Sequence, residues 1–135
     1  MLTRQKISTL TVRSEQEIVA VRQAVRKAMA DLRLSLVDQT KMVTAASELA
    51  RNMLIYGGGG EATLETLTNG NRQGLCVHFV DRGPGIPDIE LALRDGYTTG
   101  NGMGLGLGGA RRLVNEFDIE SKPGEGTRVT ITRWR

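Results

Sequence analysis

The fold is decided by a stretch that opens with Asp81-Arg82-Gly83-Pro84-Gly85 and closes with Gly102-Met103-Gly104-Leu105-Gly106-Leu107-Gly108-Gly109. Most of the 17 glycines of the chain lie between residues 57 and 109. Glycine tolerates positive φ angles and lets the backbone approach another group closely. The two clusters therefore predict tight loops that hold a nucleotide, the first at its base and the second at its phosphates.

Ahead of the glycine clusters, the sequence predicts a helix from about residue 35 to about residue 55. Ser35 followed by Asp38 has the spacing of a helix-capping box. The apolar residues that recur at three- and four-residue steps are Met42, Ala46, Leu49 and Met53. Glu48 and Asn52 fall on a different arc of this helix, one turn apart, so their side chains point the same way.

Hydrophobic periodicity predicts the remaining elements. They are a strand over 7–12, a helix over 15–32, two paired strands over 62–67 and 75–80, a short helix over 87–93, a helix over 110–115, and two paired strands over 117–121 and 127–134. The first strand is expected at a sheet edge, and the strand over 75–80, apolar on both faces, at the centre. This order predicts an α+β two-layer sandwich: one mixed, largely antiparallel sheet with helices on one face, in a single domain over 1–135.

The bulk composition describes a soluble globular protein. Of the 135 residues, 39% are hydrophobic and 24% are charged, and the sequence contains no apolar run of about 18 residues that could span a membrane. A single cysteine excludes an internal disulfide and fits a cytoplasmic protein. With a net charge of +3 and only two Tyr, two Phe and one Trp, a nucleic-acid partner is not expected.

Each motif has both a chemical and a purely structural interpretation. Asp81 ends a buried strand, where an unpaired carboxylate is costly, so it either accepts a hydrogen bond from the adenine amine or caps a turn. The stretch 102–106 either offers backbone N–H groups to phosphate or is a flexible loop entering a helix. Glu48 and Asn52 supply either a base and a Mg²⁺ ligand or part of a solvated helix face. The second cluster is not a Walker A loop, because no Gly-Lys-Ser/Thr follows it.

The order of the motifs along the chain is more specific than any one of them. The motifs are Glu48-x-x-x-Asn52 on a helix, Asp81-x-Gly83-x-Gly85 after a strand, Gly102-x-Gly104-x-Gly106 before a helix, and Gly124-x-Gly126-Thr127 at the start of a strand. In this order the sequence resembles the GHKL superfamily, whose Bergerat-type ATP-binding fold is shared by gyrase, Hsp90, histidine kinases and MutL. The resemblance spans roughly residues 36 to 131.

Three segments narrow the resemblance to the RsbT-like switch serine/threonine protein kinases, with anti-sigma-factor kinases as close relatives. The segments are 47–52, 96–107 and 110–117. The resemblance implies an ATP-dependent kinase of a bacterial partner-switching, stressosome-type pathway. Its substrate would be a STAS-domain antagonist or scaffold protein, and its downstream partner a phosphatase, a cyclase or a sigma-factor regulator. An anti-sigma factor or nucleotide-gated binding module with little kinase activity remains the alternative, and an inert fold with structural glycines is a third hypothesis.

The resemblance also implies a role for each matching residue. The residues implied to bind nucleotide are Asn52, Asp81, Gly83, Gly85, Ile86, Gly102, Met103, Gly104, Leu105, Gly106 and Thr127. Asn52 would ligate Mg²⁺ between the phosphates, and Glu48 would orient or deprotonate the attacking hydroxyl. Asp81, helped by Thr127, would bind the adenine amine, and residues 86–101 would form a lid over the nucleotide.

Two classes within the superfamily fit this chain less well. Histidine kinases carry dimerisation helices and a phospho-acceptor histidine upstream, whereas the only histidine here, His78, lies in the middle of a predicted strand. His78 and Cys76 are interpreted as packing residues of the core. Gyrase-like and MutL-like members need a transducer domain, for which the chain has no room. Gly108-Gly109 stand where many close relatives carry a proline, and Arg111 and Arg112 are interpreted as a solvated helix face.

Overall fold

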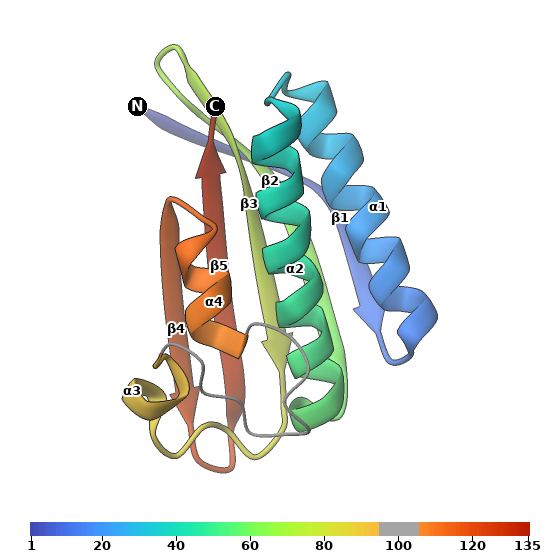
Figure 1. Cartoon of the computed structure of the whole chain (residues 1–135), viewed down its shortest axis with the longest axis vertical. Helices are drawn as coiled ribbons and strands as arrows, with labels where there is room; N and C mark the ends of the chain where they lie inside the picture. The colour runs from blue at the N-terminus through green and yellow to red at the C-terminus, as the bar shows by residue number, and fades with distance from the viewer. Residues whose placement is uncertain (95–105) are drawn as a thin grey trace.

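The molecule is built on a five-stranded sheet in the order β1-β2-β3-β5-β4, in which all four pairings are antiparallel (Figure 1). The strands are β1 (Leu2–Val12), β2 (Gly60–Asn69), β3 (Arg72–Asp81), β4 (Glu116–Lys122) and β5 (Gly126–Trp134). The computed structural model of the chain describes residues 1–94 and 106–135. The predicted positions of the first strand at an edge and of β3 at the centre are confirmed.

The helices pack on one face of this sheet, which confirms the predicted two-layer α+β sandwich (Figure 1). They are α1 (Glu15–Asp31), α2 (Leu36–Gly57), α3 (Ile89–Ala92) and α4 (Gly106–Arg112). At the start of α2 the Ser35 hydroxyl accepts a hydrogen bond from the Asp38 backbone N–H at 3.1 Å, as the capping signal predicts. None of the helices within 1–94 and 106–135 is long and apolar enough to cross a membrane.

A continuous hydrophobic core fills the space between the sheet and the helices. Leu75, Val77 and Phe79 of β3 point into it and are at most 2% exposed. The helices contribute side chains that are at most 3% exposed, including Ile18, Val21, Val25, Met42, Leu49 and Met53. Burial of apolar surface of this kind supplies most of the favourable free energy of folding. The strict alternation along β3 sends Cys76 and His78 to the opposite face of the sheet.

The interpretation of His78 as a core packing residue is wrong. Its ring lies on the face of the sheet away from the helices and is hydrogen-bonded at both nitrogens, to Glu65 and to Thr130. Cys76 is buried, at 1% exposure, but it also lies on that outer face and outside the main core. Apolar neighbours in the strand suggested burial on both faces, whereas polar side chains from β2 and β5 surround His78.

Several elements have different lengths from those predicted. β1 begins at Leu2 rather than at residue 7, because its polar N-terminal half pairs with β2 along its whole length. The first hairpin closes through Gly70 and Asn71 alone, with Gly70 at a φ of 64°, so both strands extend into the predicted loop. α4 ends at Arg112 rather than near residue 115, where the Asn115 backbone N–H already bonds to Thr132 of β5.

A partly buried ion pair ties the start of α2 to the far end of the sheet. Arg133 of β5 donates from Nη2 and Nε to Oδ1 of Asp38, at 2.6 and 3.1 Å, and from Nη1 to the Leu113 carbonyl at 2.8 Å. The hydrogen bond from Arg133 holds the pKa of the Asp38 carboxyl below its ordinary value. One guanidinium therefore connects α2, the end of α4 and β5.

Replacing Asp38 by asparagine is expected to lower the free energy of unfolding by about 1 to 3 kcal/mol at neutral pH, because Arg133 loses its charged acceptor. Since the folded-state pKa is depressed, the contribution is fully present above the ordinary aspartate pKa and is lost as the pH falls through the depressed value. Urea denaturation of both proteins at a series of pH values should show the difference shrinking at acid pH.

The matched control is Asp31→Asn, which removes an exposed carboxylate whose partner, Lys27, is also exposed. This change is expected to cost less than about 0.5 kcal/mol. Equal costs for the two substitutions, or a cost for Asp38→Asn that does not depend on pH, would contradict the assigned role of the Arg133 pair.

Candidate functional site

The site is organised around Asp81, the last residue of β3. Its backbone pairs with Gly60 of β2 on one side and with Thr127 of β5 on the other, so the position of Asp81 is set by the sheet. The side chain accepts a hydrogen bond at Oδ1 from the Gly83 backbone N–H, at 2.9 Å. Gly57, at the end of α2, lies directly against the carboxylate: a Cβ added to it would lie 2.5 Å from the carboxyl carbon.

Three backbone segments meet around this carboxylate with no space for side chains between them. A Cβ added to Gly83 would lie 2.6 Å from the Gly57 Cα atom. At the start of β5, Gly126 has a φ of 101°, and a Cβ there would overlap the Asp81 carbonyl oxygen. The end of α2, the loop after β3 and the start of β5 can therefore converge only because glycine occupies all three contact positions.

The Ser121 hydroxyl joins the loop after β3 to the hairpin between β4 and β5. It accepts a hydrogen bond from the Ile86 backbone N–H at 2.7 Å. It also lies 2.8 Å from the Thr127 hydroxyl and 3.2 Å from the Gly126 carbonyl oxygen, to either of which its proton can be donated. A further bond runs from the Gly124 N–H to the Pro84 carbonyl at 2.8 Å. The 82–86 loop is thus held along one wall of the site.

Glu48 and Asn52 lie on α2, the helix whose last residue touches Asp81. Both side chains are half-buried and one turn apart, as the sequence predicts. At 1.5 Å per residue, Asn52 lies roughly 7.5 Å and Glu48 roughly 13.5 Å along the helix axis from Gly57. Along the axis of α2 the order is therefore the contact of Gly57 with the Asp81 carboxylate of β3, then the Asn52 amide, then the Glu48 carboxylate.

The first half of the second glycine cluster lies outside the described residues. Gly102, Met103, Gly104 and Leu105 lie there, as does the part of the predicted lid from 95 to 101. The described part of the predicted lid, 86–94, includes the single-turn helix α3. Gly106 is described and begins α4, which has seven residues and packs against α2.

Sequence reasoning did not assign two residues of this site. Gly57 lies outside the two glycine clusters that the sequence assigns to the nucleotide, yet its missing side chain makes room for the Asp81 carboxylate. Ser121 lies in a strand with alternating polar residues, and nothing in that pattern distinguishes it from its exposed neighbours. Its signal is positional: it pairs with Thr127 across the second hairpin, beside the first glycine loop. Arg111 and Arg112 are exposed.

The described residues suit the amine of a nucleotide base. Asp81 Oδ1 is engaged by Gly83, while Oδ2 has no hydrogen-bond donor among residues 1–94 and 106–135. An ionised carboxylate is an acceptor only, so its second oxygen is complementary to an exocyclic amine. Thr127 lies directly opposite Asp81 on the neighbouring strand. The second carboxylate oxygen and the nearby hydroxyl are therefore chemically suited to the amine of adenine.

Comparison with known proteins gives the family. Residues 37–134 match the family described as histidine kinase-, DNA gyrase B-, and HSP90-like ATPases. The chain belongs to this family. The matched region begins at the start of α2 and ends with β5, so it includes the convergence at Asp81 as well as Glu48 and Asn52. The description of the family names ATPases, so ATP is the nucleotide that the family implies.

Relatives within the ATPase family are regulatory proteins. The chain is 41% identical over 127 residues to the serine/threonine-protein kinase RsbT of Bacillus subtilis, covering 94% of this chain and 96% of that protein. It is 33% identical over 97 residues to the anti-sigma F factor of Thermoanaerobacter sp., covering 67% of this chain and 66% of that protein.

Solved structures of the same fold include the RsbU and RsbW domains of a Mycobacterium tuberculosis protein, with a TM-score of 0.65 at 22% identity. That match covers 98% of this chain and 33% of the other. The SiaB-SiaC complex of Pseudomonas aeruginosa matches with a TM-score of 0.55 at 15% identity, over 96% of this chain and 91% of the other. These likenesses extend the ATPase fold to β1 and α1, which precede the matched region.

The convergence at Asp81 predicts different effects for two neighbouring glycines. Gly126→Ala is expected to lower the free energy of unfolding by more than about 2 kcal/mol, because a Cβ would overlap the Asp81 carbonyl at an unfavourable φ. Gly124→Ala is the matched control: its φ is 79°, but a Cβ there would meet nothing within 4 Å. It should cost only about 1 kcal/mol. Chemical denaturation measures both, and equal costs would argue against the tight convergence.

Proposed function

We propose that this protein is an ATP-dependent serine/threonine protein kinase of a bacterial partner-switching pathway. The observation that carries the proposal is the order of groups along the axis of α2: the contact of Gly57 with Asp81, then Asn52, then Glu48. A kinase needs its groups in the same order: a contact for the base, a ligand for the phosphates and a group for the acceptor hydroxyl. The near full-length likeness to a serine/threonine-protein kinase supports the same conclusion.

ATP would lie with its base at the end of β3. In the proposal, Asp81 accepts a hydrogen bond from the adenine amine, Thr127 assists it, and Gly83, Gly85 and Ile86 run beside the ring. The backbone N–H groups of 102–106 bind the phosphates, a role that rests on the sequence of that stretch. Residues 86–101 cover the nucleotide as a lid within one ATPase domain over 1–135. Bound ATP supplies the γ-phosphoryl group for transfer to a protein hydroxyl.

Glu48 and Asn52 carry the chemical step in this proposal. Asn52 offers its amide oxygen to a Mg²⁺ ion that neutralises the phosphate charge, since Mg²⁺ prefers oxygen ligands. Glu48 orients the acceptor serine or threonine and takes its proton as the oxygen attacks phosphorus. The bond from the γ-phosphorus to the bridging oxygen breaks, and ADP leaves. Phosphoryl transfer depends mainly on such positioning and charge neutralisation, so a small domain suffices.

The relatives support a proposal for the substrate class. We propose a STAS-domain protein of the antagonist or stressosome type as the substrate, and a phosphatase, cyclase or sigma-factor regulator as the partner released by phosphorylation. The support is the likeness to proteins named as a serine/threonine-protein kinase and an anti-sigma F factor. A cytoplasmic location is part of the proposal and rests on the single cysteine of the sequence.

One observation favours a second candidate function, that of a nucleotide-gated binding module. The 33% identical relatives are named anti-sigma F factors, and a protein of that kind captures a sigma factor. In that case ADP or ATP would control capture of a partner without a phosphorylated product. The two candidates share the nucleotide site and differ only in the use of Glu48.

The base contact is tested by Asp81→Asn. Asparagine keeps an oxygen for the Gly83 N–H but replaces the second carboxylate oxygen by an amide group, so the loop should persist while the adenine contact is lost. The Kd for ADP should rise by about 10- to 100-fold, because a hydrogen bond to a charged group contributes about 1.5 to 3 kcal/mol. Calorimetry, or the thermal shift produced by nucleotide, measures this effect.

Asp118→Asn on the exposed side of β4 is the control and should leave nucleotide affinity unchanged. If wild-type protein shows no thermal shift at millimolar ADP with Mg²⁺, both candidate functions are excluded. If wild-type protein binds ADP and Asp81→Asn binds it with the same affinity, nucleotide binding stands and the assignment of Asp81 is wrong.

The kinase step is tested by Glu48→Gln. Transfer of labelled phosphate from ATP to STAS-domain proteins should fall by about 10²- to 10⁴-fold, the usual contribution of a positioned base. Binding of ADP should be retained. Glu61→Gln, on an exposed position of β2, is the matched control and should keep wild-type transfer. Nucleotide-dependent capture of a sigma factor, with no phosphorylated product from wild-type protein, would favour the binding module instead.

A further inference from the structure

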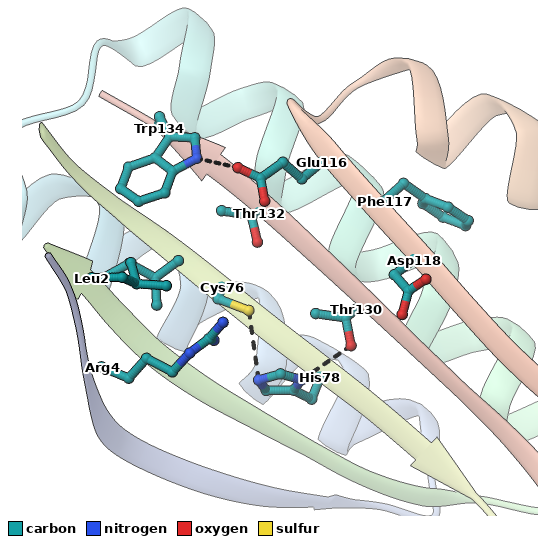
Figure 2. A pocket seen from close by; sticks show the side chains of 11 residues that line it. Leu2, Arg4, Cys76, His78, Glu116, Phe117, Asp118, Thr130, Thr132 and Trp134 are labelled. Carbon is teal, nitrogen blue, oxygen red and sulfur yellow. Dashed lines mark hydrogen bonds between the residues drawn. The ribbon is translucent and has the colours of Figure 1, made fainter. Parts of the chain in front are cut away.

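The face of the sheet away from the helices carries a cluster of three potential metal ligands. Glu65 of β2 is the direct cross-strand partner of Cys76 in β3. His78 follows Cys76 by two residues and therefore points to the same side of the sheet. Figure 2 shows the Cys76 and His78 side chains side by side on β3. The sheet register thus brings a carboxylate, a thiol and an imidazole together. None of these three residues is assigned to the nucleotide site.

The ligand atoms of the cluster converge on one point. Glu65 Oε1 lies 2.5 Å from His78 Nε2, Cys76 Sγ lies 3.5 Å from the same nitrogen, and all three atoms lie within 4.8 Å of one another. The other ring nitrogen, Nδ1, lies 3.1 Å from the Thr130 hydroxyl. Such a partner fixes the ring and leaves Nε2 directed at the cluster, as is usual for metal-binding histidines.

The cluster is reachable from solvent through a hollow on the outer face of the sheet. The hollow has a volume of about 340 Å³, and Cys76 and His78 form part of its lining together with Glu116, Asp118 and Trp134 (Figure 2). The side chains of Glu65 and His78 are 19% and 25% exposed. A metal ion with a water ligand could therefore enter without opening the hydrophobic core.

We propose that Glu65, Cys76 and His78 form a zinc-binding site on the outer face of the sheet. Zn²⁺ binds thiolate, imidazole and carboxylate ligands, and three protein ligands leave a fourth tetrahedral position for water. Thiolate and glutamate together balance its two positive charges. The ion takes the place of the hydrogen between His78 Nε2 and Glu65 Oε1, and the Cys76 thiol releases its proton on binding.

The three atoms come within about 1.5 Å of the spacing of a tetrahedral site, since none of their separations exceeds 4.8 Å. Zinc bond lengths of 2.0 to 2.3 Å imply ligand-to-ligand separations of roughly 3.3 to 3.7 Å. The Cys76–His78 distance already matches, and Glu65 has to withdraw from His78 by less than about 1 Å. The opposing charge is Arg4 of β1, whose Nη1 atom lies 3.4 Å from Glu65 Oε1. Its side chain is 51% exposed, so it can turn into solvent.

The sequence makes the site easy to test, because the chain holds one cysteine and one histidine. Untagged wild-type protein is titrated with Co²⁺ as a spectroscopic probe and then with Zn²⁺, without nucleotide, which itself binds these ions. We expect saturation at one Co²⁺ per chain with a thiolate-to-cobalt absorption band, and its displacement by Zn²⁺. The ring protons of the single histidine should shift in the NMR spectrum at the same stoichiometry.

Substitutions separate this cluster from adventitious binding. Cys76→Ser should abolish the thiolate band, and His78→Gln and Glu65→Gln should each weaken zinc binding by at least about tenfold. Arg4→Gln removes the neighbouring positive charge and should strengthen binding severalfold. Asp118 lines the same hollow but lies outside the cluster. Asp118→Asn is therefore the matched control, and its affinity for zinc should stay within about twofold of wild type.

The proposal is overturned if wild-type protein gives no thiolate band and no histidine shift at a large excess of Co²⁺ or Zn²⁺. It is also overturned if zinc affinity is unchanged in His78→Gln and Glu65→Gln. Circular dichroism of each variant shows whether it is folded. Should Cys76→Ser fail to fold, the histidine shift of wild-type protein and the opposite effects of Glu65→Gln and Arg4→Gln decide the question. None of these measurements depends on kinase activity.

Discussion

The contact between the Asp81 carboxylate and the backbone of Gly57 is the constraint on which the rest of the site depends. It joins the end of α2 to the end of β3, and it exists because neither Gly57 nor Gly83 carries a side chain. A helix that ended farther from the strand would carry Asn52 and Glu48 away from the acidic acceptor. The close backbone approach therefore determines the spacing of every group along α2 relative to Asp81.

Antiparallel pairing of β3, β5 and β4 positions the site residues that do not lie on α2. Because β5 lies next to β3, Thr127 is directly opposite Asp81, although 46 positions separate them in the printed sequence. β4 then brings Ser121 to Thr127, and the Ser121 hydroxyl holds the loop at Ile86. The start of α2 is fixed independently through Arg133 and Asp38 at the other end of the sheet. The start of α2 is thus attached to β5, and its end lies against β3.

The two faces of the sheet serve different chemistry. The alternation along β3 commits Leu75, Val77 and Phe79 to the core under the helices, and this core supports α2. The same alternation places Cys76 and His78 on the open face, where Glu65 of β2 meets them. A protein of this fold can therefore carry a nucleotide site at the end of its central strand and a separate ligand cluster on the outer face, without either disturbing the other.

Much of the fold, and the family, could be predicted from the sequence, and the candidate site residues could be proposed from it. Periodicity located α1, α2 and the hairpins, and the ordered motifs from Glu48 to Thr127 indicated the family, because local patterns reflect which face of each element is buried. Other features depend on contacts with residues distant in the chain. They are the length of β1, the early end of α4, and the contacts that Gly57 and Ser121 make.

What the sequence alone determined is therefore the set of elements, the family and the order of the candidate site residues. Only the tertiary structure decided that Gly57 touches Asp81, that Ser121 bridges two loops, and that His78 belongs to a polar cluster with Glu65 instead of the core. The physical reason is that these contacts follow from strand register and close backbone approach. Neither leaves a periodic signal in the residues themselves.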